Sequence, residues 1–384
     1  MPRSSVRVPA LLAAIALGAA ALCPADAAEP RPSLHDPQDG RFDLSAFLDT
    51  AYGFVPVVSP ITEPAVGYGA VAALVFIDRN PPAAGGGFVR PNIAAAGGLA
   101  TQNSTDGLFA GHLGSWMDGR LRTEIALADA DMNLEFFGLD ADPTAGHGGL
   151  GYSVAATGGL AGASYRVASA PLWIGLRYAQ AATKVTLREP GFDPPEQALD
   201  GREIRLAGLT PSLTYDTRDN FFTPTRGWYL DLKVPVYREG LGGDRDFELA
   251  TLAGMYFRPV SPSLYLGLRA AGKTSSDGTP FYLRPYVALR GVQALRYQGE
   301  QAFEAEAELR WQLQPRFSLV GFAGSGVARS EFAGRHREQD VGAGGAGFRY
   351  LIARSYGLHM GLDVAWGPDD PVLYVVFGSQ WLRP

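Results

Sequence analysis

Three glutamates are the strongest candidates for chemistry in this sequence. Glu304, Glu306 and Glu308 occupy every second position, so an extended chain carries all three on one face. Adjacent carboxylates are costly in a dry protein core unless they are paired. An arginine is the best partner, because a guanidinium forms bidentate, charge-assisted bonds with a carboxylate. We therefore expect these side chains to face a water-filled interior and to require a cation nearby.

The five histidines do not suggest an active site. His359 and Asp363 lie on one side of a predicted strand, but roughly 13 Å apart at about 3.3 Å per residue. Residues 342–347 match G-x-G-x-x-G, yet no helix follows that could hold a phosphate, so small residues in a strand explain them better. No catalytic triad or metal-ligand spacing emerges elsewhere. We expect no enzymatic activity, catalytic residue, cofactor or metal.

Alternating apolar and polar residues indicate the elements that position these side chains. The alternation is clear in residues 228–237, 264–270, 303–312 and 358–366. Predicted strands of about 10 to 13 residues match a membrane-spanning strand, whereas strands of soluble sandwiches usually have about 5 to 6 residues. Membrane-spanning strands must form a closed barrel to satisfy their backbone groups. The sequence therefore predicts an all-β, transmembrane antiparallel β-barrel.

We count sixteen predicted strands, with fourteen as the alternative because the first three connections fit the pattern poorly. Later connections alternate in length, with short ones at 117–120, 167–171 and 314–316, and long ones at 138–150, 189–202 and 330–339. Short periplasmic turns and long external loops are typical of outer-membrane barrels. With an even number of strands, this alternation places both chain termini in the periplasm.

The N-terminal residues have the pattern of a secretory signal peptide. Arg3 and Arg7 precede an apolar run at 8–22, and Ala25-Asp26-Ala27 fits a cleavage site. We expect a signal peptide, a short periplasmic segment and a transmembrane barrel, at residues 1–27, 28–48 and 49–384. A turn at residues 43–48 is also predicted at the periplasmic mouth of the barrel.

Two motifs carry a resemblance to a known family. Residues 213–227, LTYDTRDNFFTPTRG, resemble the central signature of the BamA and TamA outer-membrane assembly superfamily, also called bacterial surface antigens. Residues 289–292, LRGV, are similar to its VRGF loop tip. Residues 307–311 and 322–326 then resemble two of its strands. The resemblance implies a barrel in the bacterial outer membrane.

In that family, the loop before the twelfth strand folds into the lumen, and its arginine pairs with acidic residues of the wall. The resemblance implies that Arg290 and Gly291 form this loop tip, within an inward-folded loop at about 274–301. Glu308 is then the expected wall partner. Glu306 would substitute for a family aspartate that this sequence lacks. These four residues form the expected lumen loop tether.

The first motif contributes a turn rather than a site. We expect Asp216, Arg218, Asp219 and Gly227 to have a structural role, with side-chain to backbone bonds and an Arg-Asp pair locking a periplasmic turn.

The C-terminal residues resemble the signal by which barrels are recognised for insertion. Alternating apolar residues of a predicted strand at 372–382 lead through Phe377 to Trp381. The resemblance implies recognition by the cell's barrel assembly machinery.

Two functional readings remain open at this point. The 28–48 segment is too short for a POTRA repeat, so we expect a barrel-only member. It would assemble or translocate outer-membrane proteins or lipids through a weak seam between its first and last strands. The alternative is a passive or gated channel, or a membrane platform for a periplasmic partner.

Expected partners are lipopolysaccharide or phospholipid and a periplasmic protein. Nucleic acid is not expected at a net charge of -6.

Overall fold

The computed structural model describes residues 33–50, 53–78, 92–137, 149–188, 201–332 and 335–382. The expected signal peptide, 1–27, lies outside the described residues, as does the beginning of the 28–48 segment. Within the described ranges, no helix has the length and apolar character needed to cross a membrane.

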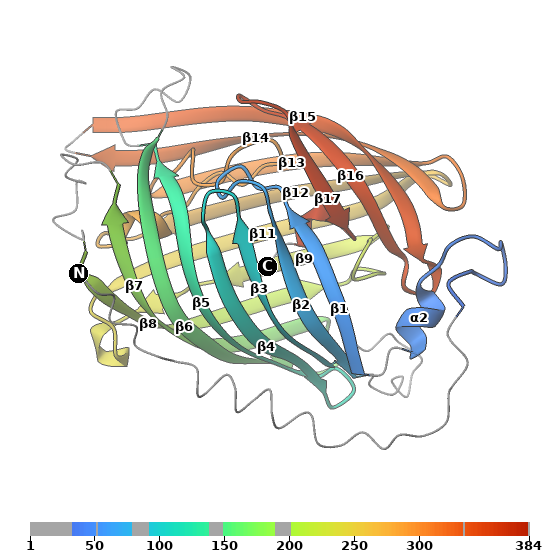
Figure 1. Cartoon of the computed structure of the whole chain (residues 1–384), viewed down its shortest axis with the longest axis horizontal. Coiled ribbons are helices and arrows are strands. Elements are labelled where there is room, and N and C mark those ends of the chain that lie inside the picture. Colours follow the sequence, from blue (N-terminus) through green and yellow to red (C-terminus); the bar gives the residue numbers. More distant parts are fainter. Residues whose placement is uncertain are drawn as a thin grey trace. The chain divides into compact units, whose positions relative to one another are not determined.

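Within the described residues, seventeen antiparallel strands form one sheet, and each helix is short (Figure 1). The first strands are β1 (Gly53–Ile61), β2 (Gly69–Asp78), β3 (Asn92–Thr101), β4 (Asp106–Trp116), β5 (Leu121–Phe136), β6 (Leu150–Arg166), β7 (Leu172–Leu187), β8 (Glu203–Asp216) and β9 (Gly227–Lys233). The others are β10 (Val236–Tyr237), β11 (Phe247–Ser261), β12 (Leu264–Ser275), β13 (Gln301–Gln312), β14 (Phe317–Phe332), β15 (Arg335–Ala353), β16 (Leu358–Trp366) and β17 (Val372–Phe377). The helices are α2 (Ser45–Thr50), η1 (Glu239–Leu241), η2 (Phe281–Leu283), η3 (Arg354–Tyr356) and η4 (Gln380–Leu382).

Strands pair with their neighbours in chain order, with one interruption. Both β9 and β10 pair with β8 on one side and with β11 on the other. They are therefore two parts of one strand position, broken at Val234 and Pro235. Proline has no N–H for the ladder, which accounts for a break at this point.

The alternation along β13 shows why these residues form a membrane barrel. Phe303, Leu309 and Trp311 are exposed on its outer face, while Glu304 and Glu306 are buried on its inner face. Exposed tryptophans also lie near the ends of β4, β9 and β16. An apolar outer face with aromatic residues at its borders is what a lipid bilayer requires. The predicted transmembrane β-barrel is confirmed.

The C-terminal strand is shorter than predicted. The expected strand at 372–382 ends at Phe377, because Gly378 adopts a positive φ of 73° and η4 follows. The chain therefore turns away from the sheet before Trp381.

The first and last strands do not close the sheet by pairing. In the described part of the chain, β1 pairs only with β2, and β17 pairs only with β16. We call the boundary between β1 and β17 the seam.

Candidate functional site

The loop between β12 and β13 lies inside the barrel, as expected. Its residues Val287, Leu289, Val292 and Tyr297 are buried in one apolar cluster with side chains of the wall strands β13, β14 and β15. Apolar residues on an inward loop are stable only where the wall offers a matching surface. Burial of these apolar residues therefore stabilises the loop in its position inside the lumen.

Arg290, at the tip of this loop, is held by three carboxylates. Its Nε and Nη2 donate to Glu306 Oε1 at 3.0 and 2.5 Å. Its Nη1 lies 2.8 Å from Glu308 Oε2 and 3.0 Å from Asp363 Oδ2. The guanidinium also stacks 3.6 Å from the centre of the Phe322 ring. The structure thus brings Arg290, Glu306 and Glu308 together. It also adds Asp363 and Phe322, which were not in the set predicted from the sequence.

Asp363 on β16 is the acidic residue that sequence reasoning missed. Its side chain is completely buried, and Arg349 of β15 binds it through two bonds of 2.5 and 2.9 Å. Two arginines and three carboxylates therefore form one network between the loop tip and the inner face of β13, β15 and β16. A buried charge without a partner is very costly, so each member of the network depends on the others.

Gly291 fixes the loop tip against the last strands. Its φ of 86° lies in the left-handed region, and an added Cβ would come within 3.1 Å of Ala365 Cβ. Its backbone N–H donates to the Tyr374 hydroxyl of β17 at 3.1 Å. Both the backbone conformation and the close approach therefore require glycine here.

Glu304, the first of the three glutamates, binds a second part of the loop. One of its oxygens accepts the Ala288 backbone N–H at 2.8 Å. The same carboxylate also binds Arg269 at 2.6 Å and Lys273 at 3.1 Å. All three glutamates are therefore paired with cations. A cavity of about 530 Å³ remains between the loop and the wall, lined by Arg269, Lys273 and Arg290 among others.

The C-terminal aromatic residues lie on different sides of the wall. Phe377 is exposed on the outer face, but Trp381 is buried beside Met255 and Phe257. Its indole N–H donates to Glu306 Oε1 at 2.5 Å. The predicted strand at 372–382 therefore does not reach Trp381, because β17 ends four residues earlier.

The turn of the first motif contains the expected local bonds. Arg218 binds Asp216 with two bonds of 2.8 and 2.9 Å and lies over the Tyr229 ring. Asp219 accepts two backbone N–H groups of the same loop, at 2.9 and 3.1 Å. Gly227 has a φ of 111°, and a Cβ there would collide with a backbone carbonyl.

The same loop also reaches another part of the barrel, which the sequence did not indicate. Asn220 Nδ2 donates to the Tyr356 carbonyl in η3 at 2.9 Å. The Ser379 N–H donates to the Phe222 carbonyl at 2.6 Å. The loop between β8 and β9 therefore contacts the turn before β16 and the C-terminal tail.

The lumen loop contacts both sides of the seam. The Ala294 N–H donates to Glu63 Oε1, just beyond β1, at 3.2 Å. On the other side, Gly291 is bonded to Tyr374 of β17. Side-chain contacts of the loop tip, rather than a strand ladder, thus bridge the seam at this end.

The fold is an all-β barrel with an inward loop that is held by an arginine. The protein is therefore of the class of bacterial outer-membrane barrels. The chain belongs to the Omp85 superfamily, whose domain matches residues 152–368. A search of curated protein sequences finds no significant match.

Among the solved structures that share the fold are three BamA or CdiB proteins. The first is BamA from Haemophilus ducreyi lacking POTRA domains 1–3, with a TM-score of 0.56 and 12% identity over 90% of this chain and 80% of that chain. CdiB from Acinetobacter baumannii gives 0.56 and 9% identity over 86% and 66%, and CdiB from Escherichia coli gives 0.55 and 12% over 86% and 60%. At these identities the likeness establishes the barrel fold.

Proposed function

We propose that this barrel assembles or translocates outer-membrane proteins or lipids by opening transiently between β1 and β17. The observation that carries the proposal is the seam, where the first and last strands form no ladder in the described residues. In a bilayer, unpaired backbone groups are costly. A strand of a client would satisfy them, which gives the seam affinity for such a strand.

Two prolines make the edge of β1 a weak partner for β17. Pro56 and Pro60 are four residues apart, so their nitrogens face the same edge of the strand. Proline in a sheet places its nitrogen toward an unpaired edge, and here the other edge pairs with β2 over the whole strand. The edge facing β17 therefore lacks two donors, which supports a seam that opens readily.

The inward loop argues against a permanently open channel. Arg290 and Glu304 attach the loop at two places, and apolar residues of the loop pack against the wall. We propose that Arg290, Gly291, Glu306 and Glu308 tether the loop as a plug. We also propose that Asp216, Arg218, Asp219 and Gly227 stabilise the periplasmic turn.

The test is an insertion assay in proteoliposomes that contain the purified barrel. An unfolded outer-membrane barrel protein is added, and its insertion is followed by protease protection. Cysteines at Val58 and at Leu373 or Val375, all on the outer face, lock the seam when oxidised. The only native cysteine, Cys23, lies in the expected signal peptide. Ala70 and Ala100, directly opposite each other on β2 and β3, give the control disulfide.

The proposal predicts that oxidation across the seam abolishes insertion and that reduction restores it, whereas the control pair has no effect. Insertion that continues with a locked seam contradicts it. If the wild-type barrel instead shows a large steady conductance and no insertion, the channel alternative is correct. Crosslinking in intact membranes would then identify the proposed periplasmic partner and the contacts with lipid and with the assembly machinery.

A further inference from the structure

The described residues before β1 form a short hairpin followed by a helix. We call residues 34–50 the N-terminal latch. His35 and Phe42 form an isolated bridge, and the Asp36 N–H donates to the Arg41 carbonyl at 2.9 Å. The Asp43 N–H donates to the Leu34 carbonyl at 2.9 Å, which closes the hairpin. Helix α2 follows directly and leads toward β1.

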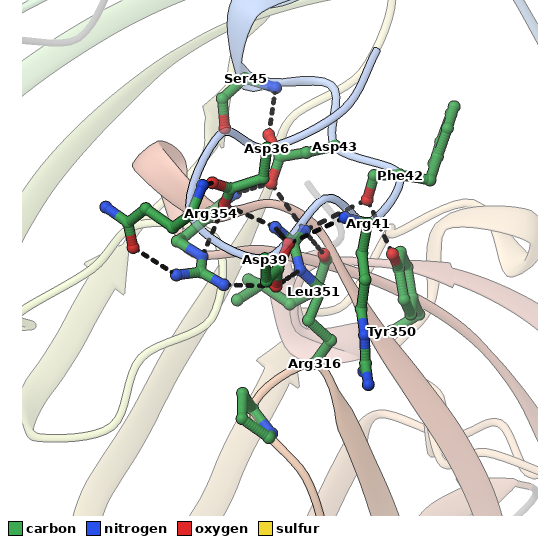
Figure 2. Close-up of polar contacts among 12 residues, drawn as sticks. Asp36, Asp39, Arg41, Phe42, Asp43, Ser45, Arg316, Tyr350, Leu351 and Arg354 are labelled. Atoms are coloured by element: carbon green, nitrogen blue, oxygen red, sulfur yellow. Dashed lines mark hydrogen bonds and ion pairs between the residues drawn. The ribbon is translucent and has the colours of Figure 1, made fainter.

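Three aspartates of the latch surround one arginine of the barrel (Figure 2). Arg316 lies in the turn between β13 and β14, and its side chain is fully buried. Its nitrogens lie 2.6 Å from Asp36, 2.6 Å from Asp39 and 2.7 Å from Asp43. Its Nη1 also donates to the carbonyl of Leu351 at 3.0 Å. The guanidinium is therefore enclosed by the latch on one side and by the barrel on the other.

A second arginine extends the contact to the next turn. Arg354, in η3 between β15 and β16, lies 2.8 Å from Asp36 and 2.5 Å from Asp39. Its backbone N–H donates to Asp43 at 3.0 Å. The same three carboxylates thus bind two arginines from two different turns, which makes the docking specific for this place.

Backbone contacts fix the latch at the same turn. The Leu44 N–H donates to the Ile352 carbonyl at 2.7 Å. The Ser355 N–H donates to Ser45 Oγ, at the start of α2, at 3.0 Å. The hydroxyl of Tyr350 donates to the Phe42 carbonyl at 2.7 Å. The start of α2 is thereby held against the end of β15 (Figure 1).

The position of these contacts matters because of the seam. The docking partners lie in the β13–β14 turn, at the end of β15 and in the β15–β16 turn, all before β17 in the sheet. The latch instead continues into β1, on the other side of the seam. Helix α2 spans about 9 Å at 1.5 Å per residue. The three steps from Thr50 to Gly53 add at most about 11 Å. A docked latch therefore holds the first residue of β1 within about 20 Å of Ser45.

We infer that the N-terminal latch is an ionic strap across the seam, which holds β1 to the β15–β16 turn where no strand ladder does so. While the aspartates remain bound to Arg316 and Arg354, the seam opens at the start of β1 only as far as the strap allows. Undocking or stretching of the strap is required for wider opening. This inference rests on the proposed opening of the seam.

The test measures the separation across the seam by pulsed electron resonance between spin labels at Val58 and Val375, in the full chain in lipid nanodiscs. The first variant inserts about ten Gly and Ser residues between Thr50 and Gly53, which adds roughly 17 Å of reach and leaves every latch contact intact. The matched control inserts the same linker between Arg188 and Gly201. The second variant, Arg316→Met, keeps the side-chain volume but removes the charge that the aspartates bind.

The latch inference predicts that the linker after Thr50 and Arg316→Met both broaden the distance distribution to longer values, and that the control linker leaves it unchanged. A linker after Thr50 with no effect overturns the inference, even if Arg316→Met unfolds the protein, because the latch then serves stability alone. The distances are measured without any client. A failure of the latch is thus distinguishable from a failure of the assembly function, which the insertion assay reports.

Discussion

Arg290 shows how one residue joins the loop to the wall. It contributes the central charge of a network in which Glu306, Glu308 and Asp363 would otherwise repel one another. Each carboxylate comes from a wall strand, while the arginine comes from the loop. Arg290 therefore ties the tip of the loop to the wall, while Glu304 and apolar packing hold other parts of the loop.

Arg290→Ala should release the loop and open the lumen. Removing one partner of a buried ion network leaves uncompensated charges and costs on the order of 3 to 5 kcal/mol. We expect a mostly closed wild type and an open variant in single-channel recordings from planar bilayers. Arg205→Ala is the control, because its ion pair with Asp244 is exposed and contributes little to stability. Equal conductance of wild type and Arg290→Ala would show that the arginine does not hold a plug.

The latch and the edge of β1 act together as elements. The strand that borders the seam lacks two backbone donors, and the segment before it is attached elsewhere by ion pairs. A weak edge next to a strong anchor allows one strand to move without losing its place in the barrel. The proposed opening of the seam thus depends on these two elements and not on the sheet as a whole.

Docking of the latch should persist to low pH. Hydrogen bonds from Arg316 lower the pKa of Asp39 from 3.8 to about 2. Burial would raise the pKa of Asp43, but bonds from Ser45 and Arg316 keep it below its usual value. A carboxyl whose folded pKa is lowered stabilises the fold above its unfolded pKa, and this contribution is lost as the pH falls toward the folded pKa.

We therefore expect a spin label at Gln38 to stay immobile from pH 7 to pH 5 and to become mobile only as the pH falls from about 4 toward 2. The other charged groups around Arg316 are Asp36, Arg41 and Arg354. A release near pH 6 would contradict the role of the aspartates.

Replacing the two prolines of β1 should strengthen the seam. Pro56→Thr with Pro60→Thr returns two donors to the edge that faces β17. Each new bond is worth about 0.5 to 1.5 kcal/mol. We expect slower hydrogen exchange of the β17 amides and less insertion of a client. Val57→Thr, whose N–H faces β2, is the control. Unchanged exchange in the double variant would mean that the prolines do not weaken the seam.

At the scale of the whole molecule, the barrel follows from the sequence because each strand carries its own apolar and polar faces. The inward loop followed from the LRGV motif and from the charge of the three glutamates. The role of Asp363 in the network could not be predicted. The alternation along the strand places its side chain inside the barrel, but it does not identify the side chains that lie beside it.

The latch was also beyond reach of the sequence. Asp36, Asp39 and Asp43 look like a solvated acidic segment, and their partner Arg316 is far away along the chain. Trp381 was misplaced for a different reason. The apolar alternation continues past Phe377, but the backbone turns at Gly378. Contacts between distant segments and local changes of backbone direction leave no periodic signal.

The most direct measurement of the central claim is site-specific photo-crosslinking during insertion of a client. Crosslinkers replace Val58 on β1, Leu373 on β17 and, as the control, Ile125, an exposed outer residue of β5 far from the seam in strand order. The proposed function predicts adducts with the client at Val58 and Leu373 and none at Ile125. Insertion without adducts at the seam, or with equal adducts at all three positions, would contradict it.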